Sequence, residues 1–160
     1  GNYGVLCLFE NGKLLKVAIA ERIEYIMAKV AVSGITGNTS LGRFLNDEHI
    51  KQNALRTINI VSEATNSVMN GVVVVDMKAD KNGVAKVTEI NIRYVAYNCC
   101  LASAGFNLAE YHLLTALGRS TELTKEQDII FPKNNRFLRD VDGLPIYIKD
   151  FKPLAIGEYL

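Results

Sequence analysis

The sequence predicts an α+β fold, an antiparallel sheet with helices packed on one face. Apolar runs are joined by Asn-Gly dipeptides, which favour the tight turns of antiparallel hairpins. One other stretch repeats apolar residues at three- and four-residue spacing, as one face of a helix does, and another has helix-capping residues at its two ends. Because the strands come in hairpins and do not alternate with helices, a parallel doubly wound sheet is disfavoured.

The elements follow in order along the first half of the chain. Residues 3–22 form two apolar runs around Asn11-Gly12, which predicts a first hairpin. The next stretch, 33–47, is rich in glycine, serine, threonine and asparagine and follows no period, so a loop is predicted. From Asp47 to Asn66 the helical spacing of apolar residues predicts an amphipathic helix.

The second half starts with a valine-rich hairpin over residues 71–94. A second helix is predicted over 107–118, because Asn107 and Glu110 have capping-box spacing and Gly118 suits a helix C-terminus. Short apolar runs broken by prolines then predict an edge strand or an arm near the end of the chain.

Composition excludes several classes of partner. The 160 residues carry a formal net charge of +1, so no net field draws the chain to nucleic acid or to an anionic membrane. No stretch approaches the roughly 18 apolar residues of a membrane span. The three cysteines are an odd number and include the adjacent pair Cys99 and Cys100, which predicts free thiols in a reducing cytoplasm.

The second hairpin carries polar side chains where apolar ones would pack better. If Asn82-Gly83 closes it as a two-residue turn, Asp76 lies opposite Glu89. Side chains alternate between the two faces of a strand, so Asn91 and Arg93 share the face of Glu89.

Two carboxylates at that separation repel each other. Either one of them holds a proton with a raised pKa, or a cation lies between them. Oxygen ligands without histidine or cysteine suit Mg²⁺, which usually completes its shell with waters and substrate phosphates and so indicates a nucleotide. The alternative is an amphipathic hairpin whose polar residues simply face solvent. It places these apolar residues inside: Val73, Val75, Met77, Ile90 and Ile92.

Asp76, followed by "DKNG" and then by "EINIR" from Glu89 to Arg93, resembles the metal-binding segment of the ATP-grasp superfamily. Within that superfamily, the segment most resembles that of ligases like the large chain of carbamoyl-phosphate synthetase. Weaker matches in the expected order extend the resemblance over residues 1–118: "GNYGVLCLFENGKLL", "SGITGNTS" and "SAGFNLAEYHLLTALG". The resemblance implies a C-terminal ATP-grasp lobe at 1–118, with 119–160 as an extension packed on the same domain.

By this resemblance Asp76, Glu89 and Asn91 are metal ligands that hold Mg²⁺, or Mn²⁺ in its place, against ATP. Arg93 and Arg22 are the catalytic residues, contacting the phosphates or an acyl-phosphate intermediate. The implied reaction joins a small carboxylate substrate to an amine through that intermediate.

The family's nucleotide-gripping lobe precedes this region, so the chain is interpreted as a fragment that is inactive without its upstream lobes and that could form a homodimer. Asn2 stands where relatives carry a glutamate, which leaves one substrate contact open. The alternative function is a non-catalytic domain of this fold that binds a protein partner.

Overall fold

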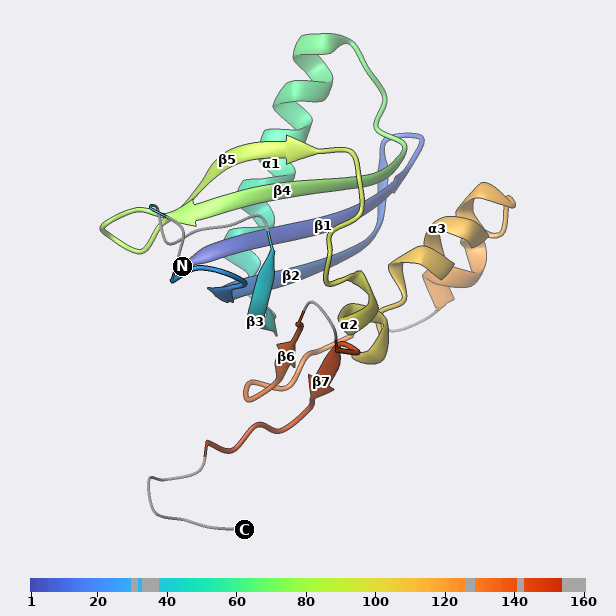
Figure 1. The fold of residues 1–160 in the computed structure, drawn as a ribbon. Helices are drawn as coiled ribbons and strands as arrows, with labels where there is room; N and C mark the ends of the chain where they lie inside the picture. Colours follow the sequence, from blue (N-terminus) through green and yellow to red (C-terminus); the bar gives the residue numbers. More distant parts are fainter. Residues whose placement is uncertain (30–31, 33–37, 126–128, 141–142, 154–160) are drawn as a thin grey trace.

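The fold is a twisted antiparallel sheet with helices on both sides (Figure 1). In this computed structural model the structure describes residues 1–29, 32, 38–125, 129–140 and 143–153. The described elements, in chain order, are β1 (Asn2–Glu10), β2 (Lys13–Tyr25), β3 (Thr39–Leu45), α1 (Glu48–Thr65), β4 (Gly71–Ala79), β5 (Ala85–Asn91), α2 (Asn98–Ser103), α3 (Leu108–Ala116), a 3₁₀ turn (Ser120–Lys125), β6 (Arg136–Leu138) and β7 (Ile146–Ile148).

The described strands form one sheet in the order β5-β4-β1-β2-β3-β6-β7. Every neighbouring pair runs antiparallel. The strand β4 therefore lies between β1 and β5, and it is hydrogen-bonded to both.

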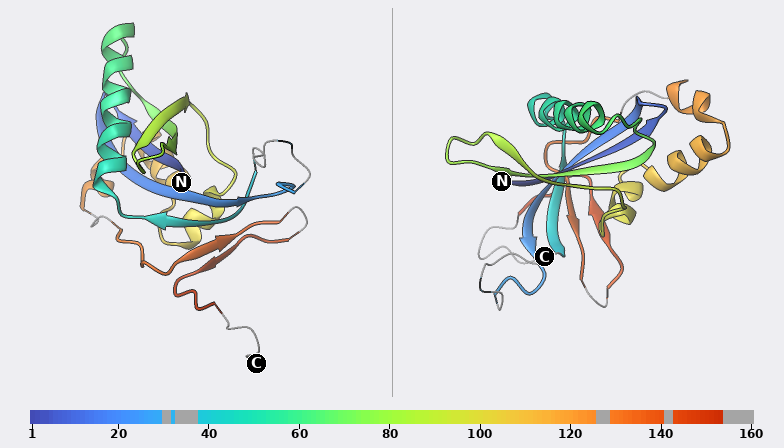
Figure 2. Two further views of the ribbon diagram at one scale, coloured as in Figure 1. Left: turned by 90° about the vertical axis from the view of Figure 1, so that its left-hand side faces the viewer. Right: turned by 90° about the horizontal axis from the view of Figure 1, so that it is seen from above.

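The antiparallel α+β fold is confirmed, but the helices cover both faces of the sheet and not one (Figure 2). The helix α1 packs on the face that carries Val5 and Val75. The helices α2 and α3 pack on the opposite face, which carries Leu6 and Val74. The central strands have apolar residues at successive positions, so both faces are apolar and each needs a cover.

The first hairpin and the first long helix agree with the sequence prediction. Asn11 and Gly12 both have positive φ, 49° and 78°, as a two-residue hairpin turn of the primed type requires. The side chain of Asp47 accepts a hydrogen bond from the Ile50 backbone at 3.0 Å and so caps α1. The helix ends where Asn66 adopts a left-handed conformation.

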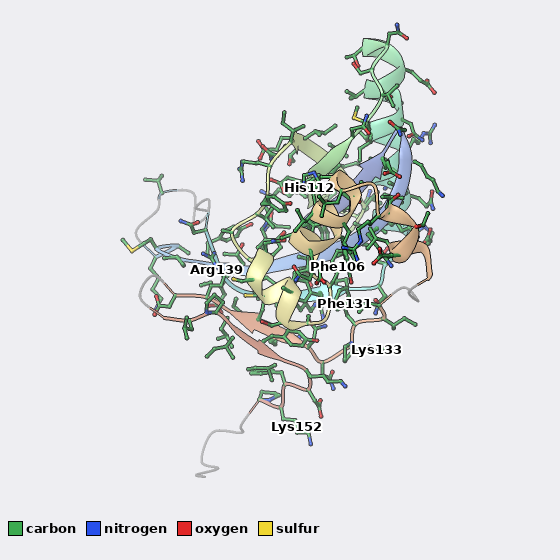
Figure 3. The ribbon with its side chains drawn as sticks, turned by 90° about the vertical axis from the view of Figure 1, so that its right-hand side faces the viewer. Phe106, His112, Phe131, Lys133, Arg139 and Lys152 are labelled. Atoms are coloured by element: carbon green, nitrogen blue, oxygen red, sulfur yellow. The ribbon has the colours of Figure 1, made fainter. Side chains whose placement is uncertain are left out.

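The predicted helix over 107–118 is present as α3 (Figure 3). Asn107 accepts a hydrogen bond from the Glu110 backbone, and Gly118 has φ +71° just beyond the helix. The short helix α2 was not predicted. It buries Cys100 and Leu101 against the sheet, whereas Cys99 is exposed, and all three cysteines of the chain are free.

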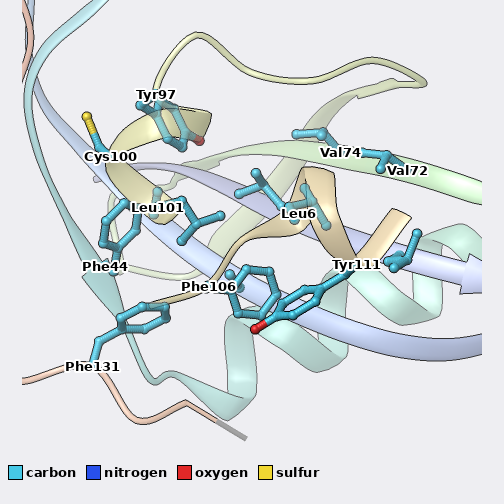
Figure 4. Packing of buried hydrophobic residues seen from close by; sticks show 14 of the residues in the cluster. Leu6, Phe44, Val72, Val74, Tyr97, Cys100, Leu101, Phe106, Tyr111 and Phe131 are labelled. Atoms are coloured by element: carbon cyan, nitrogen blue, oxygen red, sulfur yellow. The ribbon is translucent and has the colours of Figure 1, made fainter. Parts of the chain in front are cut away.

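The loop predicted over 33–47 is wrong where it overlaps β3, and residues 33–37 lie outside the described part of the chain. Although this segment is rich in small polar residues, it forms a strand that is paired on both sides, with β2 and with β6. Phe44 is buried beside the ring of Phe131, at a centroid distance of 5.1 Å (Figure 4). The ring of Phe137 stacks on it at a centroid distance of 4.9 Å.

A buried asparagine ties β3 to the later part of the chain. The amide of Asn135 donates to the backbone oxygens of Phe44 at 2.8 Å and of Pro132 at 2.6 Å. Its carbonyl oxygen accepts from the Phe44 N–H at 2.8 Å. One wholly buried side chain therefore satisfies backbone groups of two segments that are far apart in sequence.

The end of the chain adds short strands to the same sheet. An edge strand is confirmed at β7, and the additional strand β6 joins it to β3. Residues 154–160, which belong to the predicted edge strand or arm, lie outside the described residues. No helix in the described part of the chain is long and apolar enough to cross a membrane.

The turn of the second hairpin differs from the prediction. Ala79 pairs with Ala85, and Asp80 is closed onto Val84 by a backbone hydrogen bond of 2.9 Å. The tip is therefore a three-residue loop with Gly83 at φ +81°, not a two-residue Asn-Gly turn. Asp80 favours this loop because its side chain accepts hydrogen bonds from the backbone of Asn82 and of Val84, each at 2.9 Å.

Replacing Asn135 with alanine is expected to lower the free energy of unfolding by about 1–3 kcal/mol, because the buried backbone N–H and C=O of Phe44 each lose a hydrogen bond. Chemical denaturation measures the change. The matched control is Asn134→Ala, at an exposed neighbouring position, which should change stability by less than about 0.5 kcal/mol. Equal effects at the two positions would contradict the role given to Asn135.

Candidate functional site

A pocket of about 500 Å³ opens beside the second hairpin. All five residues that the sequence singled out line it: Arg22 from β2, Asp76 from β4, Glu89 and Asn91 from β5, and Arg93 just after β5. The remaining described lining residues come from the end of β2, the start of β3 and the segment before α2: Tyr25, Asn38, Thr39, Val95, Ala96 and Tyr97. We call this the site pocket.

Strand pairing fixes the position of Asp76 from both sides. On one side it lies opposite Gly4 of β1, and on the other it lies opposite Glu89 of β5, as predicted. Asp76 is two residues beyond Val74, so its side chain lies on the face that α2 and α3 cover. The polar cluster thus continues the apolar face of the sheet beyond the point where its helical cover ends.

The register survives the incorrect turn because of a bulge. The pairing slips between Asp76 and Met77, where Met77 faces Val87 and leaves Thr88 as the additional residue. The hydroxyl of Thr88 donates to the Asp76 backbone oxygen at 3.0 Å, which holds the bulge in place. Relative to the predicted two-residue turn, the three-residue loop shifts the pairing of the two strands by one residue. The bulge shifts the pairing back by one residue, so Glu89 still faces Asp76.

The two carboxyl groups and the amide of Asn91 converge. The Asn91 amide donates to Asp76 Oδ2 at 3.3 Å and to Glu89 Oε1 at 3.0 Å. Burial raises the pKa of Asp76, Arg22 opposes that effect, and the hydrogen bond shared with Glu89 adds to it. The pKa of Glu89 is lowered by its hydrogen bonds with Asn91 and with Asp76. Burial therefore favours the protonated form of Asp76, whereas the hydrogen bonds of Glu89 favour its ionised form.

The arginines differ in their setting. Arg22 forms an ion pair with Asp76, and the two side chains are only 18% and 14% exposed. Arg93 is exposed, and its guanidinium donates to the Tyr94 backbone oxygen at 3.3 Å. Arg22 is consequently a fixed positive group in the wall of the pocket, whereas Arg93 lies at its rim.

The interpretation of the hairpin as an ordinary amphipathic ribbon is wrong for Asp76, whose carboxylate is mostly buried. It holds for Glu89, which is exposed. That alternative also placed Ile92 inside, but the side chain of Ile92 is 87% exposed.

Two contributors to the site were missed by sequence reasoning, Gly4 and Tyr97. A Cβ atom on Gly4 would lie 2.5 Å from the Tyr97 hydroxyl, 3.1 Å from an Arg22 nitrogen and 3.5 Å from an Asp76 oxygen. The missing side chain of Gly4 thus leaves room for these three groups to meet. No local sequence pattern indicates this close approach, because it depends on contacts between segments that are distant in sequence.

No protein-family model matches the sequence, and no curated protein matches it. Among solved structures, one match is a protein of Archaeoglobus fulgidus assigned to the ATP-grasp superfamily. It is 21% identical, with a TM-score of 0.44 over 72% of this chain and 34% of that chain. The chain therefore spans about a third of the length of that protein. A similarity of this size does not assign the chain to a family, and it adds no argument about the site.

Gly4→Ala should destabilise the protein by about 1–3 kcal/mol, because the added methyl group overlaps the Tyr97 hydroxyl and presses on the guanidinium of Arg22. Thermal and chemical denaturation test this. The control is Gly143→Ala, where the nearest atom to the new Cβ is a side-chain carbon at 3.7 Å, an ordinary contact. A Gly4 variant as stable as the Gly143 variant would contradict the close approach described here.

The protonation of the two carboxyl groups is a second test. In the absence of metal, the pKa of Asp76 should lie above its ordinary value of 3.8 because the group is buried, and the pKa of Glu89 should lie below its ordinary value of 4.5 because of its hydrogen bonds. Carboxyl ¹³C chemical shifts followed by NMR report each group. A pKa of Asp76 below 3.8 would contradict the effect assigned to its burial.

Proposed function

We propose that this chain is the nucleotide- and magnesium-binding portion of an ATP-dependent carboxylate ligase that works through an acyl-phosphate intermediate. The observation that carries the proposal is the convergence of Asp76, Glu89 and Asn91 on one pocket that also contains Arg22 and Arg93. The relation to ligases like the carbamoyl-phosphate synthetase large chain, and the dependence on upstream lobes for activity, are parts of the same proposal.

The residues present fit a hard divalent cation. The carboxylates of Asp76 and Glu89 lie close together, and the side-chain amide of Asn91 contacts both. Small side-chain rotations would therefore let oxygens of all three residues bind one ion. In the described part of the chain no three acidic, histidine or cysteine side chains gather, so the protein does not provide a full coordination cage. Mg²⁺ usually takes only one or two carboxylates and completes its shell with water and phosphate oxygens. When bound, such an ion neutralises negative charge on the phosphates.

The chain's own groups orient the reactants and balance their charge. Asp76 and Glu89 would hold the cation, and Asn91 orients both carboxylates by donating to them. In the proposed reaction an oxygen of the substrate carboxylate attacks the γ-phosphorus of ATP, which releases ADP and forms the acyl phosphate. An amine then displaces phosphate. Arg22 and Arg93 would attract the negative oxygens in both steps, because positioning and charge account for most of the catalysis in such transfers.

A second candidate is a domain of this fold that binds a protein partner without catalysis. An open groove of about 1190 Å³ supports it, running from the end of β2 across β3 to β6 and β7. Several apolar side chains in the groove are strongly exposed, among them Met27, Leu144 and Ile146 at 64%, 89% and 55%. Exposed apolar grooves are typical of interaction surfaces, including those between copies of one chain.

Glu89→Gln should weaken binding of Mg²⁺ with a non-hydrolysable ATP analogue by at least about tenfold, because it removes one of two carboxylate ligands with little change in shape. Isothermal titration calorimetry on the chain together with its upstream lobes measures this. Glu63→Gln, on the exposed face of α1, is the control and should bind as the unmodified protein does.

Unchanged affinity after Glu89→Gln would count against the proposal. Binding of a protein partner that is indifferent both to nucleotide and to Glu89→Gln would favour the second candidate.

A further inference from the structure

The hydroxyl of Tyr97 is a buried polar group with no hydrogen-bond partner among the described residues. Tyr97 immediately precedes α2, is only 2% exposed, and lines the site pocket. A buried donor without a partner is costly, so its presence calls for an explanation.

Packing does not explain the hydroxyl. The ring of Tyr97 stacks on the ring of Phe137 with a centroid distance of 5.1 Å, and it approaches the ring of Phe44 at 6.5 Å. A phenylalanine would make the same ring contacts without burying an oxygen. The hydroxyl is therefore an addition to a side chain that already packs well.

The surroundings of the hydroxyl indicate what would bind it. The hydroxyl and the guanidinium of Arg22 both lie over Gly4, because a Cβ atom there would be 2.5 Å from this oxygen and 3.1 Å from a guanidinium nitrogen of Arg22. Asp76 also lies over Gly4, and its carboxylate is already paired with Arg22. Burial raises the pKa of Tyr97 to about 12, so the phenol keeps its proton at neutral pH and can donate it in a hydrogen bond.

Two donors, one neutral and one cationic, thus line the same wall of the pocket. An acceptor-only group with negative charge satisfies both at once, as a carboxylate or a phosphoryl group does. A cationic group would be repelled by the guanidinium, and a neutral carbonyl oxygen would accept these hydrogen bonds without the added attraction of opposite charge.

We propose that Tyr97 and Arg22 form an oxyanion subsite, in which the phenol and the guanidinium both donate to one carboxylate or phosphoryl group of the ligand. The inference rests on the proposed function only in taking the site pocket as the place where a ligand binds. It adds Tyr97 as a binding residue and assigns Gly4 the role of letting the phenol and the guanidinium lie close together.

The test is NMR titration of the chain with sodium acetate in one arm and with inorganic phosphate in the other, without Mg²⁺ and without nucleotide. The unmodified protein should bind at least one of the two anions, with shifts of the Tyr97 ring carbon next to the hydroxyl and of the Arg22 side-chain N–H. Tyr97→Phe should weaken that binding by about tenfold while its melting temperature stays the same or rises, because only an unpaired hydroxyl is lost.

Tyr94→Phe is the matched control. Its hydroxyl bonds to Nδ1 of His112 at 2.7 Å and does not line the pocket, so its loss should leave anion binding unchanged. Loss confined to the acetate arm assigns the subsite to a substrate carboxylate, and loss in the phosphate arm assigns it to a phosphoryl group.

Equal affinity of the Tyr97→Phe and Tyr94→Phe variants in both arms would overturn the inference. So would the absence of acetate and phosphate shifts at Tyr97 and Arg22 in the unmodified protein, a result that needs no variant. Because metal and nucleotide are left out, these outcomes are independent of whether Glu89 and Mg²⁺ behave as proposed.

Discussion

The site depends on the double pairing of β4, which is hydrogen-bonded to β1 on one side and to β5 on the other. This arrangement places Asp76 between a glycine and a second carboxylate, Glu89. The glycine allows Arg22 and Tyr97 to approach from the side of β1, and the carboxylate supplies like charge from the side of β5. Any shift of register by one residue would turn Asp76 to the opposite face, where α1 packs.

The same strands explain why polar groups can be held so rigidly. Both faces of β1 and β4 are packed by helices, so the backbone beneath the site has little freedom to relax. Tyr97 belongs to the apolar cluster on one of these faces and also lines the site pocket. Packing thereby positions a functional side chain, and the partly buried ion pair of Arg22 with Asp76 limits the cost of placing a carboxylate there.

Much of the fold and the opposition of Asp76 and Glu89 could be predicted, because strands, helix caps and Asn-Gly turns act over short distances in the sequence. The pairing of Asp76 with Glu89 was predicted correctly, although the two-residue turn from which it was predicted is wrong. The loop at Asp80 and the bulge at Thr88 were both unforeseen, and they compensate for each other. The strand β3 was missed because its small polar composition resembles a loop, whereas its pairing depends on segments much later in the chain.

The most direct test of the central claim is to map where a divalent ion binds. Mn²⁺, added at low ratio to the isotope-labelled protein, broadens NMR signals in proportion to their closeness to the ion. Broadening is expected to be centred on Asp76, Glu89 and Asn91 and to reach Tyr97. Broadening centred on other acidic residues, such as Glu48 in the first turn of α1, with the site pocket unaffected, would contradict it.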